Sequence, residues 1–516
     1  MKFAPFAACR QDFPGTEQLL ISGGDARIAI DPVSGLNKYG CKPYPDPALL
    51  AFGSSTASTI SEAAFAAANQ LRDRLLKDSG AASFEAIYAR EMQRIRRELL
   101  ELVSDLDIEL AFASSGTDAH FLAARYAASA SDHQLTDMAN TSPQIMESAI
   151  PVPLSSTLSR KRAREQTNRY ASSNLTVVMV EEDETGSGVA AALSAADADG
   201  RKLCRIELVP LRAAEGAPRP LADIDRDVTA RVIEAVALGE RVLLIMVDQS
   251  KTGLIAPSPA CVMQLHQRHP GLVEVLVDAC QFRIAPPTLR AYLQQGFMVA
   301  LTGSKFLTGP SFSAALLYPG VHGTLVRAGG DFGEVNFGLL LRWEAALAEL
   351  RRFRAVPDAL IIRYLEAFAL AVQQRLIGDL CFEPLAVPPL DRSSLLEVQS
   401  WDHIQTIFPF LLYHSTAAGR VPLERSETLQ IYRQLQQSRI QQSGSADDSV
   451  TGLRCQFGQP VACGTRDGVA VSALRLCISA RQISDAAEQN GIAGLIDDAL
   501  TALDKTAGLI CLAACR

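Results

Sequence analysis

The sequence has no long hydrophobic run and no excess of basic residues. Its 516 residues include 49 Lys and Arg against 57 Asp and Glu, a formal net charge of −8. A membrane-spanning helix needs roughly 18–20 consecutive apolar residues, whereas a run such as residues 242–247 is only long enough for a strand. Nucleic-acid binding needs a field of Lys and Arg to face the phosphates. We therefore expect neither a membrane nor a nucleic acid as a partner.

Paired cysteines are also missing. The 11 cysteines are scattered singly, without a CxxC motif or a histidine at metal-ligand spacing, which argues against a disulfide framework and a zinc site. The first ten residues, MKFAPFAACR, meet charge and proline too early for a secretory signal peptide. We expect a cytoplasmic protein without a metal site.

The remaining composition is that of a globular protein. Apolar residues make up 48% and charged residues 21% of the chain, which excludes disorder, collagen and a small disulfide scaffold. At roughly 100–200 residues per domain, the length allows two or three domains.

Residues 105–320 alternate between short apolar runs and stretches with helical periodicity. The expected strands are residues 108–113, 175–180, 203–209, 242–247, 273–277 and 297–301. The expected helices are residues 119–130, 223–238, 257–268 and 287–295. This alternation predicts an α/β fold with a mostly parallel sheet. Ligands bind beyond the carboxyl ends of such strands, so the residues that follow each strand carry the most information.

Three regions are expected along the chain. Residues 1–60, of which 20–60 are rich in Gly, Pro and Ser, form an N-terminal segment. Residues 61–335 form the large domain. Residues 336–516 begin with two long amphipathic helices, at 336–354 and 358–376, and continue as a smaller α+β domain.

Two segments have little periodicity. Residues 131–174, which include the basic stretch SRKRAR, are expected to be a solvated surface insertion; a functional basic patch is the alternative. Residues 439–450 are expected to form another loop.

Residues suited to binding or catalysis follow three of the predicted strands. SSGTD, at residues 114–118, is a turn of small residues opening a helix, which offers free N–H groups to a phosphate or serves only as a cap. Asp278 ends the strand at 273–277, and Lys305 follows the strand at 297–301. A buried acid can keep a ring nitrogen protonated, and a desolvated lysine can form a Schiff base. A pyridoxal-phosphate site requires these two groups; taken singly, they are equally explained as a helix cap and a solvated lysine.

The sequence resembles the fold-type I pyridoxal-phosphate enzymes, with most similarity to the class V aminotransferase and cysteine desulfurase branch. The resemblance covers roughly residues 50–505. It is best in the motifs VDACQ, ending at Gln281, and TGSK with the Gly-Pro that follows it. It implies that Lys305 is the Schiff-base lysine, that Asp278 pairs with the pyridine nitrogen and that Gln281 reaches the ring hydroxyl. Lys305 and Asp278 are therefore the expected catalytic residues.

The resemblance also implies further cofactor contacts. Gly116 and Thr117 match the Gly-Thr that clasps the phosphate, and Thr302 takes the place of a phosphate-binding serine. Ser304 stands where a histidine usually precedes the lysine, and Ser250 stands where an asparagine is common. These five residues are expected to bind pyridoxal phosphate.

The residue that stacks on the ring is not evident. In the family it is often aromatic or histidine, but no aromatic residue follows the strand at 175–180. We expect Glu184, Thr185 or another residue to take this place.

Substrate contacts are expected from both ends of the chain. Arg475 lies within an otherwise apolar strand, where a guanidinium must be paired. It resembles the family arginine that binds the substrate carboxylate, the alternative being a structural ion pair; Arg481 is a weaker second candidate. Asn37 and Tyr39, in the motif GLNKYG, are expected to line the substrate mouth unless this is an ordinary glycine-rich loop.

Two cysteines bear on the reaction. Cys455 and Cys463 precede Arg475 by 20 and 12 residues, a separation comparable to that of the nucleophilic cysteine in desulfurases. The alternative is that both are small buried hydrophobic residues.

Taken together, we expect a pyridoxal-phosphate enzyme that acts on an amino acid, with transamination as the first choice of reaction. Lyase or desulfurase chemistry is the second, and a non-catalytic relative of the same fold is the third. The resemblance implies a homodimer in which residues 329–338 reach the neighbouring subunit.

Overall fold

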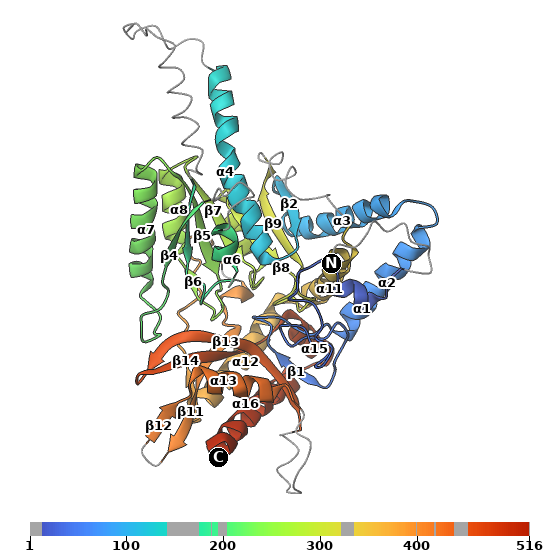
Figure 1. Cartoon of the computed structure of the whole chain (residues 1–516), viewed down its shortest axis with the longest axis vertical. Coiled ribbons are helices and arrows are strands. Elements are labelled where there is room, and N and C mark those ends of the chain that lie inside the picture. The colour runs from blue at the N-terminus through green and yellow to red at the C-terminus, as the bar shows by residue number, and fades with distance from the viewer. Residues whose placement is uncertain are drawn as a thin grey trace.

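A computed structural model describes most of the chain. The described residues are 13–141, 175–186, 188–194, 204–320, 335–398, 400–416, 419–437 and 452–514. Two sheets, each covered by helices, lie one above the other in Figure 1. The N-terminal helices lie beside the larger sheet.

The larger sheet has the order β2-β9-β8-β7-β5-β3-β4, with β6 paired to the end of β5. β9 is antiparallel to both of its neighbours, whereas β8, β7, β5, β3 and β4 run parallel. The carboxyl ends of the parallel strands therefore share one edge. The strands are β2 (Ile108–Ala113), β3 (Leu175–Val180), β4 (Arg205–Val209), β5 (Arg241–Asp248), β6 (Ile255–Ala256), β7 (Val273–Ala279), β8 (Met298–Thr302) and β9 (Ala314–Pro319).

Helices cover both faces of this sheet. On one face, Leu243 and Ile245 of β5 pack with alanines of α4, while Leu244 and Met246 face the opposite core with α7 and α8. The central strands β3, β5, β7 and β8 are mostly apolar because both of their faces are buried, whereas the edge strand β4 is partly exposed. The covering helices are α4 (Gly116–Thr141) and α6 (Val189–Ser194) on the first face, and α7 (Leu221–Ala237), α8 (Pro259–Arg268) and α9 (Pro286–Gln294) on the second.

The smaller sheet has the order β1-β13-β14-β11-β10, with β12 paired to β11. β1 is parallel to β13, and the other pairs are antiparallel. β1 thus joins the N-terminal region to the C-terminal domain. The elements are β1 (Leu49–Phe52), β10 (Phe382–Pro384), β11 (Ile407–Thr416), β12 (Gly419–Pro422), β13 (Arg454–Arg466) and β14 (Val469–Cys477), with α12 (Asp358–Ile377), α13 (Arg425–Leu435), α15 (Ala480–Glu488) and α16 (Ala493–Ala514).

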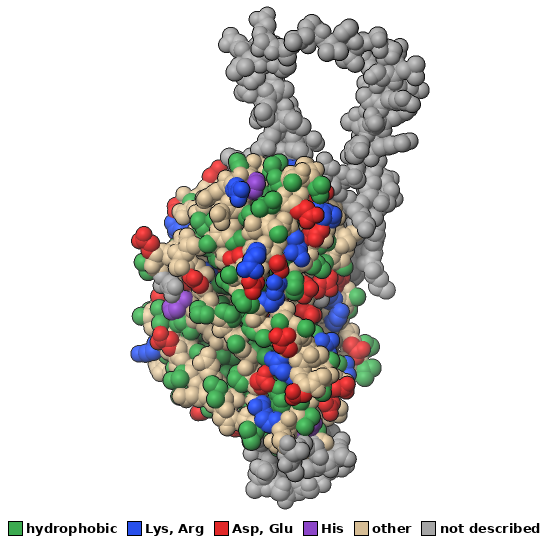
Figure 2. All heavy atoms as spheres, turned by 90° about the vertical axis from the view of Figure 1, so that its left-hand side faces the viewer, with side chains coloured by type: hydrophobic (Ala, Val, Ile, Leu, Met, Phe, Trp, Pro, Cys, Tyr) green, Lys and Arg blue, Asp and Glu red, His purple; other side chains and the backbone are tan. Residues whose placement is uncertain are grey.

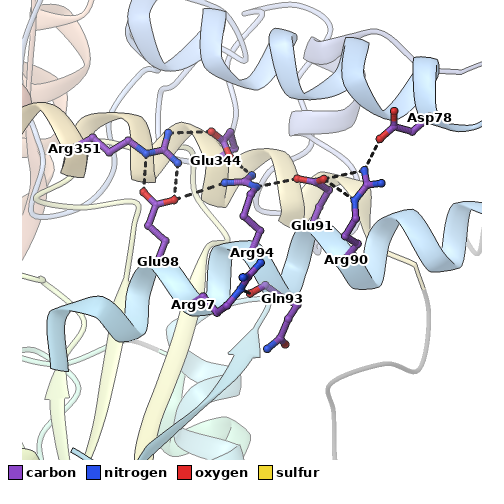
Figure 3. A network of polar contacts seen from close by, with 9 residues as sticks. All are labelled: Asp78, Arg90, Glu91, Gln93, Arg94, Arg97, Glu98, Glu344 and Arg351. Atoms are coloured by element: carbon purple, nitrogen blue, oxygen red, sulfur yellow. Dashed lines mark hydrogen bonds and ion pairs between the residues drawn. The ribbon is translucent and has the colours of Figure 1, made fainter. Parts of the chain in front are cut away.

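A third group of helices packs around α11. It consists of α1 (Thr16–Leu20), α2 (Glu62–Asp78), α3 (Phe84–Leu100) and α11 (Phe337–Arg354) itself. Arg94 of α3 contacts Glu91, Glu98 and, on α11, Glu344. Arg351 of α11 contacts Glu98 at 2.6 Å and Glu344 at 3.0 Å (Figure 3). Because Glu91 and Glu344 are buried, this network determines how α3 lies against α11.

The predicted fold class is confirmed. The chain has a mostly parallel α/β sheet and a smaller α+β unit, and five of the six predicted strands begin within one residue of the observed ones. The predictions missed α3, β1 and the antiparallel strand β9.

Only the start of the expected insertion at 131–174 lies within the described residues. Residues 131–141 continue α4, and residues 142–174 lie outside the described residues. The expected loop at 439–450 and residues 329–334 of the expected subunit contact also lie outside them.

Within the described ranges, no helix is both long enough and apolar enough to cross a membrane. In the same ranges, no group of three or more metal-ligating side chains gathers. On the face shown in Figure 2, acidic and basic side chains lie interspersed, so this face carries no continuous basic surface.

Candidate active site

A cavity of about 370 Å³ opens where the carboxyl edge of the larger sheet meets the smaller sheet and the N-terminal segment. This volume is within the range of small-molecule sites. It brings together twelve of the residues predicted from the sequence. They are Tyr39, Gly116, Thr117, Glu184, Thr185, Ser250, Asp278, Gln281, Thr302, Ser304, Lys305 and Arg475.

Asp278 is a buried, ionised carboxylate at the end of β7. Its Oδ2 accepts a hydrogen bond from Thr185 Oγ1 at 2.9 Å, and its Oδ1 accepts one from the Cys280 N–H at 3.1 Å. Burial alone would raise the pKa of Asp278, but the charges of His120 and Lys305 hold this pKa well below its usual range. The side chain therefore presents a negative charge to the cavity.

His120 accompanies this carboxylate. Its Nδ1 lies 2.7 Å from the Gly116 carbonyl oxygen, and its Nε2 lies 3.3 Å from Asp278 Oδ2. Although close, Nε2 is not aligned for a hydrogen bond, and it is buried without a hydrogen-bond partner in the described part of the chain. Burial opposes protonation, but Asp278 outweighs burial and raises the pKa of His120.

The N-terminus of α4 faces the same cavity. Ser115 and Asp118 cap each other, since the Ser115 N–H donates to Asp118 Oδ2 at 2.9 Å and the Asp118 N–H donates to Ser115 Oγ at 3.3 Å. This cap leaves the N–H groups of Gly116 and Thr117 for a ligand, as the first turn of a helix does. A Cβ on Gly116 would lie 3.0 Å from Cys280 Sγ, so a larger residue would have to displace this side chain. The turn fits an anion.

Lys305 lies in the loop between β8 and β9. No hydrogen bond or ion pair holds its ammonium within the described ranges, and it lines the cavity. The loop is held against α11, because a Cβ on Gly303 would lie 2.5 Å from Ala346 Cβ and one on Gly309 would lie 2.7 Å from it. The backbone around this amine is thus positioned by packing, while the amine itself is available.

The neighbouring polar residues are partly used by the backbone. Thr302 Oγ1 donates to the Cys280 carbonyl at 2.7 Å, and Ser304 Oγ lies 3.5 Å from Thr302 Oγ1. Gln281 Nε2 donates to the Ser55 carbonyl at 3.1 Å. The Gln281 contact attaches the N-terminal segment to the loop after β7.

The surroundings of Glu184 are not those of a residue that stacks on a ring. Its carboxylate is buried and accepts hydrogen bonds from Ser250 Oγ at 2.6 Å and Thr252 Oγ1 at 2.8 Å. Arg212 Nε lies 2.6 Å from it. Both carboxylate oxygens and the Ser250 hydroxyl are therefore occupied in joining the loops after β3 and β5. Thr185, next to Glu184, contacts Asp278 instead.

Arg475 of β14 is a buried cation without a carboxylate partner. Its Nη1 donates to the Lys251 carbonyl at 3.1 Å, and its Nη2 donates to Thr56 Oγ1 at 2.9 Å and to the Gln459 carbonyl at 2.5 Å. Its Nε has no hydrogen-bond partner in the described structure. The alternative of a structural ion pair is not seen among the described residues. Burial lowers the pKa of Arg475, and an anionic ligand would compensate for this cost.

Only one of the other predicted substrate-binding residues lines the cavity. Tyr39 lines the cavity, but Asn37 does not; it lies at a second cavity of about 20 Å³. Asn37 Oδ1 accepts the N–H groups of Tyr39 at 2.9 Å and Cys41 at 3.0 Å, which closes a turn. The side chain of Asn37 therefore shapes the loop that carries Tyr39. Arg481, on α15, also lies outside the lining of the larger cavity.

Both candidate sulfur-accepting cysteines are buried in β13. Cys455 and Cys463 are 0% and 1% exposed, and neither lines the cavity. Burial raises the pKa of the Cys455 thiol to about 11 and also raises that of Cys463. Their setting is that of small hydrophobic residues. Cys280 does line the cavity, but burial raises the pKa of its thiol well above the usual value.

Sequence reasoning missed His120 and Lys251, which line the cavity, and Arg212 and Arg283, which contact lining residues. His120 could have been found, since it lies one helical turn after Gly116 and shares its face. Lys251 follows the end of β5 and is next to Ser250, which the resemblance already assigned to the cofactor. Arg212 and Arg283 have no local signal: Arg283 is fully buried and joins Ser54 to the Ile478 carbonyl, at 2.8 Å each.

No family model and no curated protein matches the sequence. Solved structures with a similar fold include the Oryza sativa TDC with PLP, with 15% identity, a TM-score of 0.47 and coverage of 89% of this chain and 84% of that one. Mouse CSAD has 14% identity, a TM-score of 0.48 and coverage of 87% and 83%. Sphingomonas wittichii serine palmitoyltransferase has 11% identity, a TM-score of 0.49 and coverage of 89% and 88%. These likenesses are distant, so we argue the function from the site itself.

The site fits the cofactor implied by the sequence resemblance. A phosphate fits the free amides at the start of α4, and a protonated ring nitrogen fits the buried charge of Asp278. An aldehyde fits the unpartnered amine of Lys305. The buried Nε2 of His120 has no hydrogen-bond partner in the described residues, so a polar atom at the same place is available to a ligand.

Proposed function

We propose that this protein is a pyridoxal-phosphate-dependent enzyme that acts on an amino acid. One observation carries the proposal: an unpartnered lysine, a buried carboxylate and a free helix N-terminus line a single cavity. Lys305 would hold the aldehyde carbon, Asp278 the ring nitrogen, and Gly116 and Thr117 the phosphate. When bound, pyridoxal phosphate withdraws the electron pair released as a bond at the substrate's Cα breaks.

The chain's own residues set the charges around that chemistry. Asp278 keeps its negative charge because His120 and Lys305 are near, and a fixed negative charge keeps a ring nitrogen protonated. Thr185 and the Cys280 N–H hold the carboxylate in place. The Lys305 amine would also be the group that moves a proton at the substrate's Cα.

Arg475 supports an amino acid as the substrate. Its guanidinium is buried, lines the cavity and has no ion-pair partner among the described residues. A planar guanidinium binds a carboxylate through paired N–H groups. We propose that it binds the α-carboxylate and so orients the bonds at Cα.

For the reaction we propose transamination, as in the class V branch that the sequence resembles. The lyase and desulfurase alternatives remain, but a persulfide route through Cys455 is disfavoured because that thiol is buried away from the cavity. The presence of both Lys305 and Asp278 in the cavity disfavours the non-catalytic alternative. A cytoplasmic homodimer remains part of this proposal.

The first experiment locates the cofactor. The purified protein is incubated with pyridoxal phosphate, reduced with borohydride and digested, and the modified peptide is identified by mass spectrometry. We expect the label on Lys305 and its loss in Lys305→Ala. Lys251→Arg is the matched control, because Lys251 lines the same cavity and its replacement should leave the label in place. A label that survives Lys305→Ala would overturn the proposal.

The second experiment separates the reactions. Each amino acid of a panel is supplied with and without a keto-acid acceptor, and the keto acid, pyruvate and sulfide are assayed. Transamination requires the acceptor for sustained turnover, whereas elimination and desulfuration do not. Pyruvate or sulfide that forms without the acceptor would show that the protein catalyses a lyase reaction and not transamination.

A further inference from the structure

Lys251 occupies a rigid position in the wall of the cavity. It lies in the loop that joins β5 to β6, and its backbone N–H donates to the Glu184 carbonyl at 2.9 Å. Its carbonyl accepts from Arg475 Nη1 at 3.1 Å, and its Nζ donates to the Glu182 carbonyl at 2.6 Å. The loop thus contacts Arg475 through the Lys251 carbonyl and the loop after β3 through the Lys251 ammonium.

This ammonium has no counter-ion in the described residues. The Glu184 carboxylate is already paired with Arg212 at 2.6 Å, and Asp183 is exposed to solvent. Of the other lining cations, Arg27 is paired with Asp25 at 2.7 Å. Lys251 therefore forms no ion pair with a carboxylate in the described residues, although Glu184 and Asp183 lie near enough to favour its charged form.

The local electrostatics favour an incoming anion. Burial and the charges of Arg475 and Lys305 lower the pKa of Lys251 to about 8, against the opposing effect of Glu184 and Asp183. Three cations in the described lining, Lys251, Lys305 and Arg475, lack a carboxylate partner. A ligand that brings two negative groups besides the phosphate would relieve this repulsion.

We propose that the substrate is an amino acid with a second acidic group, and that Lys251 binds this group while Arg475 binds the α-carboxylate. This inference rests on the proposed function, since Lys305 is assigned there to the cofactor and Arg475 to the α-carboxylate. Lys251 is then the residue that selects acidic over neutral side chains. Its pre-positioned ammonium requires no rearrangement of the loop on binding.

Two other roles for Lys251 can be tested against this one. In the first, Lys251 and Arg475 share a single carboxylate, and the substrate's side chain makes no ionic contact. In the second, Lys251 binds the cofactor's phosphate. Each predicts a different response to substitution.

The experiment compares ligands that differ only in this charge. Aspartate is compared with asparagine, and glutamate with glutamine, by titration of the protein loaded with pyridoxal phosphate. We expect the acid of the better pair to bind about tenfold or more tightly than its amide, the effect of one charge-assisted contact. In Lys251→Met this ratio should fall to about one, and in Lys251→Arg it should persist. Because the ratio is taken within each variant, partial loss of folded protein cancels.

The outcomes are distinguishable. An unchanged ratio in Lys251→Met, with acid and amide weakened equally, would assign Lys251 to the α-carboxylate and overturn the inference. Weakened cofactor binding in Lys251→Met with an unchanged ratio would assign it to the phosphate and also overturn it. A wild-type protein that carries the cofactor on Lys305 but shows no acid preference would overturn this inference alone. Failure of the cofactor to attach to Lys305 would overturn both proposals.

Discussion

His120 Nε2 lies 3.3 Å from Asp278 Oδ2 in the wall of the cavity. The two side chains are 1% and 6% exposed as residues, so little solvent screens their interaction. Each shifts the other toward its charged form, lowering the pKa of Asp278 and raising that of His120. The histidine thereby maintains the carboxylate charge on which the proposed cofactor site depends.

This pair predicts a pH-dependent contribution to stability. Because the pKa of His120 is raised on folding, its contribution is complete below its unfolded pKa of about 6.5 and is lost as pH rises through the folded value. Asp278 remains ionised throughout that range because its pKa is lowered. The difference in unfolding free energy between the wild type and His120→Gln, measured by denaturant titration, should therefore be largest below about pH 6.5 and shrink above it. A difference independent of pH would show that the pair is not ionic.

Asp278→Asn should separate cofactor attachment from turnover. Asparagine preserves the shape but removes the charge opposite the ring nitrogen. We expect the borohydride-fixed label to remain on Lys305 while turnover falls on the order of 10²- to 10³-fold, as when a preorganised electrostatic contact is removed. Turnover close to that of the wild type would assign Asp278 a purely structural role.

Arg475→Met should weaken binding of the α-carboxylate. Loss of a charge-assisted contact should raise the dissociation constant of an amino acid roughly 10- to 100-fold. The corresponding amine, which lacks the carboxylate, should bind the wild type and the variant equally. Arg481→Met is the matched control, because that arginine lies outside the lining of the cavity. Equal losses for the amino acid and the amine would contradict a carboxylate contact.

The acid preference should itself depend on pH. Lys251 binds an anion only while protonated, and its pKa is lowered to about 8 mainly by burial and the charges of Arg475 and Lys305. The ratio of aspartate to asparagine affinity, or of glutamate to glutamine affinity, should therefore be constant below that pH and decline above it. Taking the ratio cancels the titration of the shared α-amino group. In Lys251→Arg the ratio should not decline over the same range, because arginine stays protonated.

Cys455→Ala should leave catalysis unchanged. The thiol is fully buried, and its pKa is raised to about 11 by burial, so it is neither accessible nor ionised at neutral pH. Any sulfide formed from cysteine should persist in this variant. Abolished sulfide formation in a protein that remains folded would restore the persulfide route.

Much of the fold could be predicted because its signals are local. The strands of the larger sheet are apolar on both faces, so β2, β3, β5 and β7 stand out in the sequence as short runs. The strands β1 and β9 were missed for a common reason. The strand β1 pairs with the distant β13, and β9 follows β8 without an intervening helix, so neither fits the alternation of strands and helices along the chain.

The residues of the candidate site also fall into those that could be predicted from local sequence and those that could not. Asp278 and Lys305 could be singled out because each directly follows a strand whose carboxyl end lies at the shared edge. His120 escaped notice because only folding shows that its Nε2 approaches a carboxylate 158 residues away along the chain. Glu184 was one of the stacking candidates, with Thr185, because its pairing with Arg212 cannot be deduced from spacing.

The sequence by itself determined the α/β class, the order of the strand ends and the types of group placed at each, since hydrophobic periodicity and turn residues act over a few positions. Only the tertiary structure decided which charges are compensated. It paired Glu184 with Arg212 and Asp278 with His120, and it left Lys251 and Arg475 without a carboxylate in the described structure. The physical reason is that electrostatic interaction depends on distance and burial in space, and neither follows from separation along the chain.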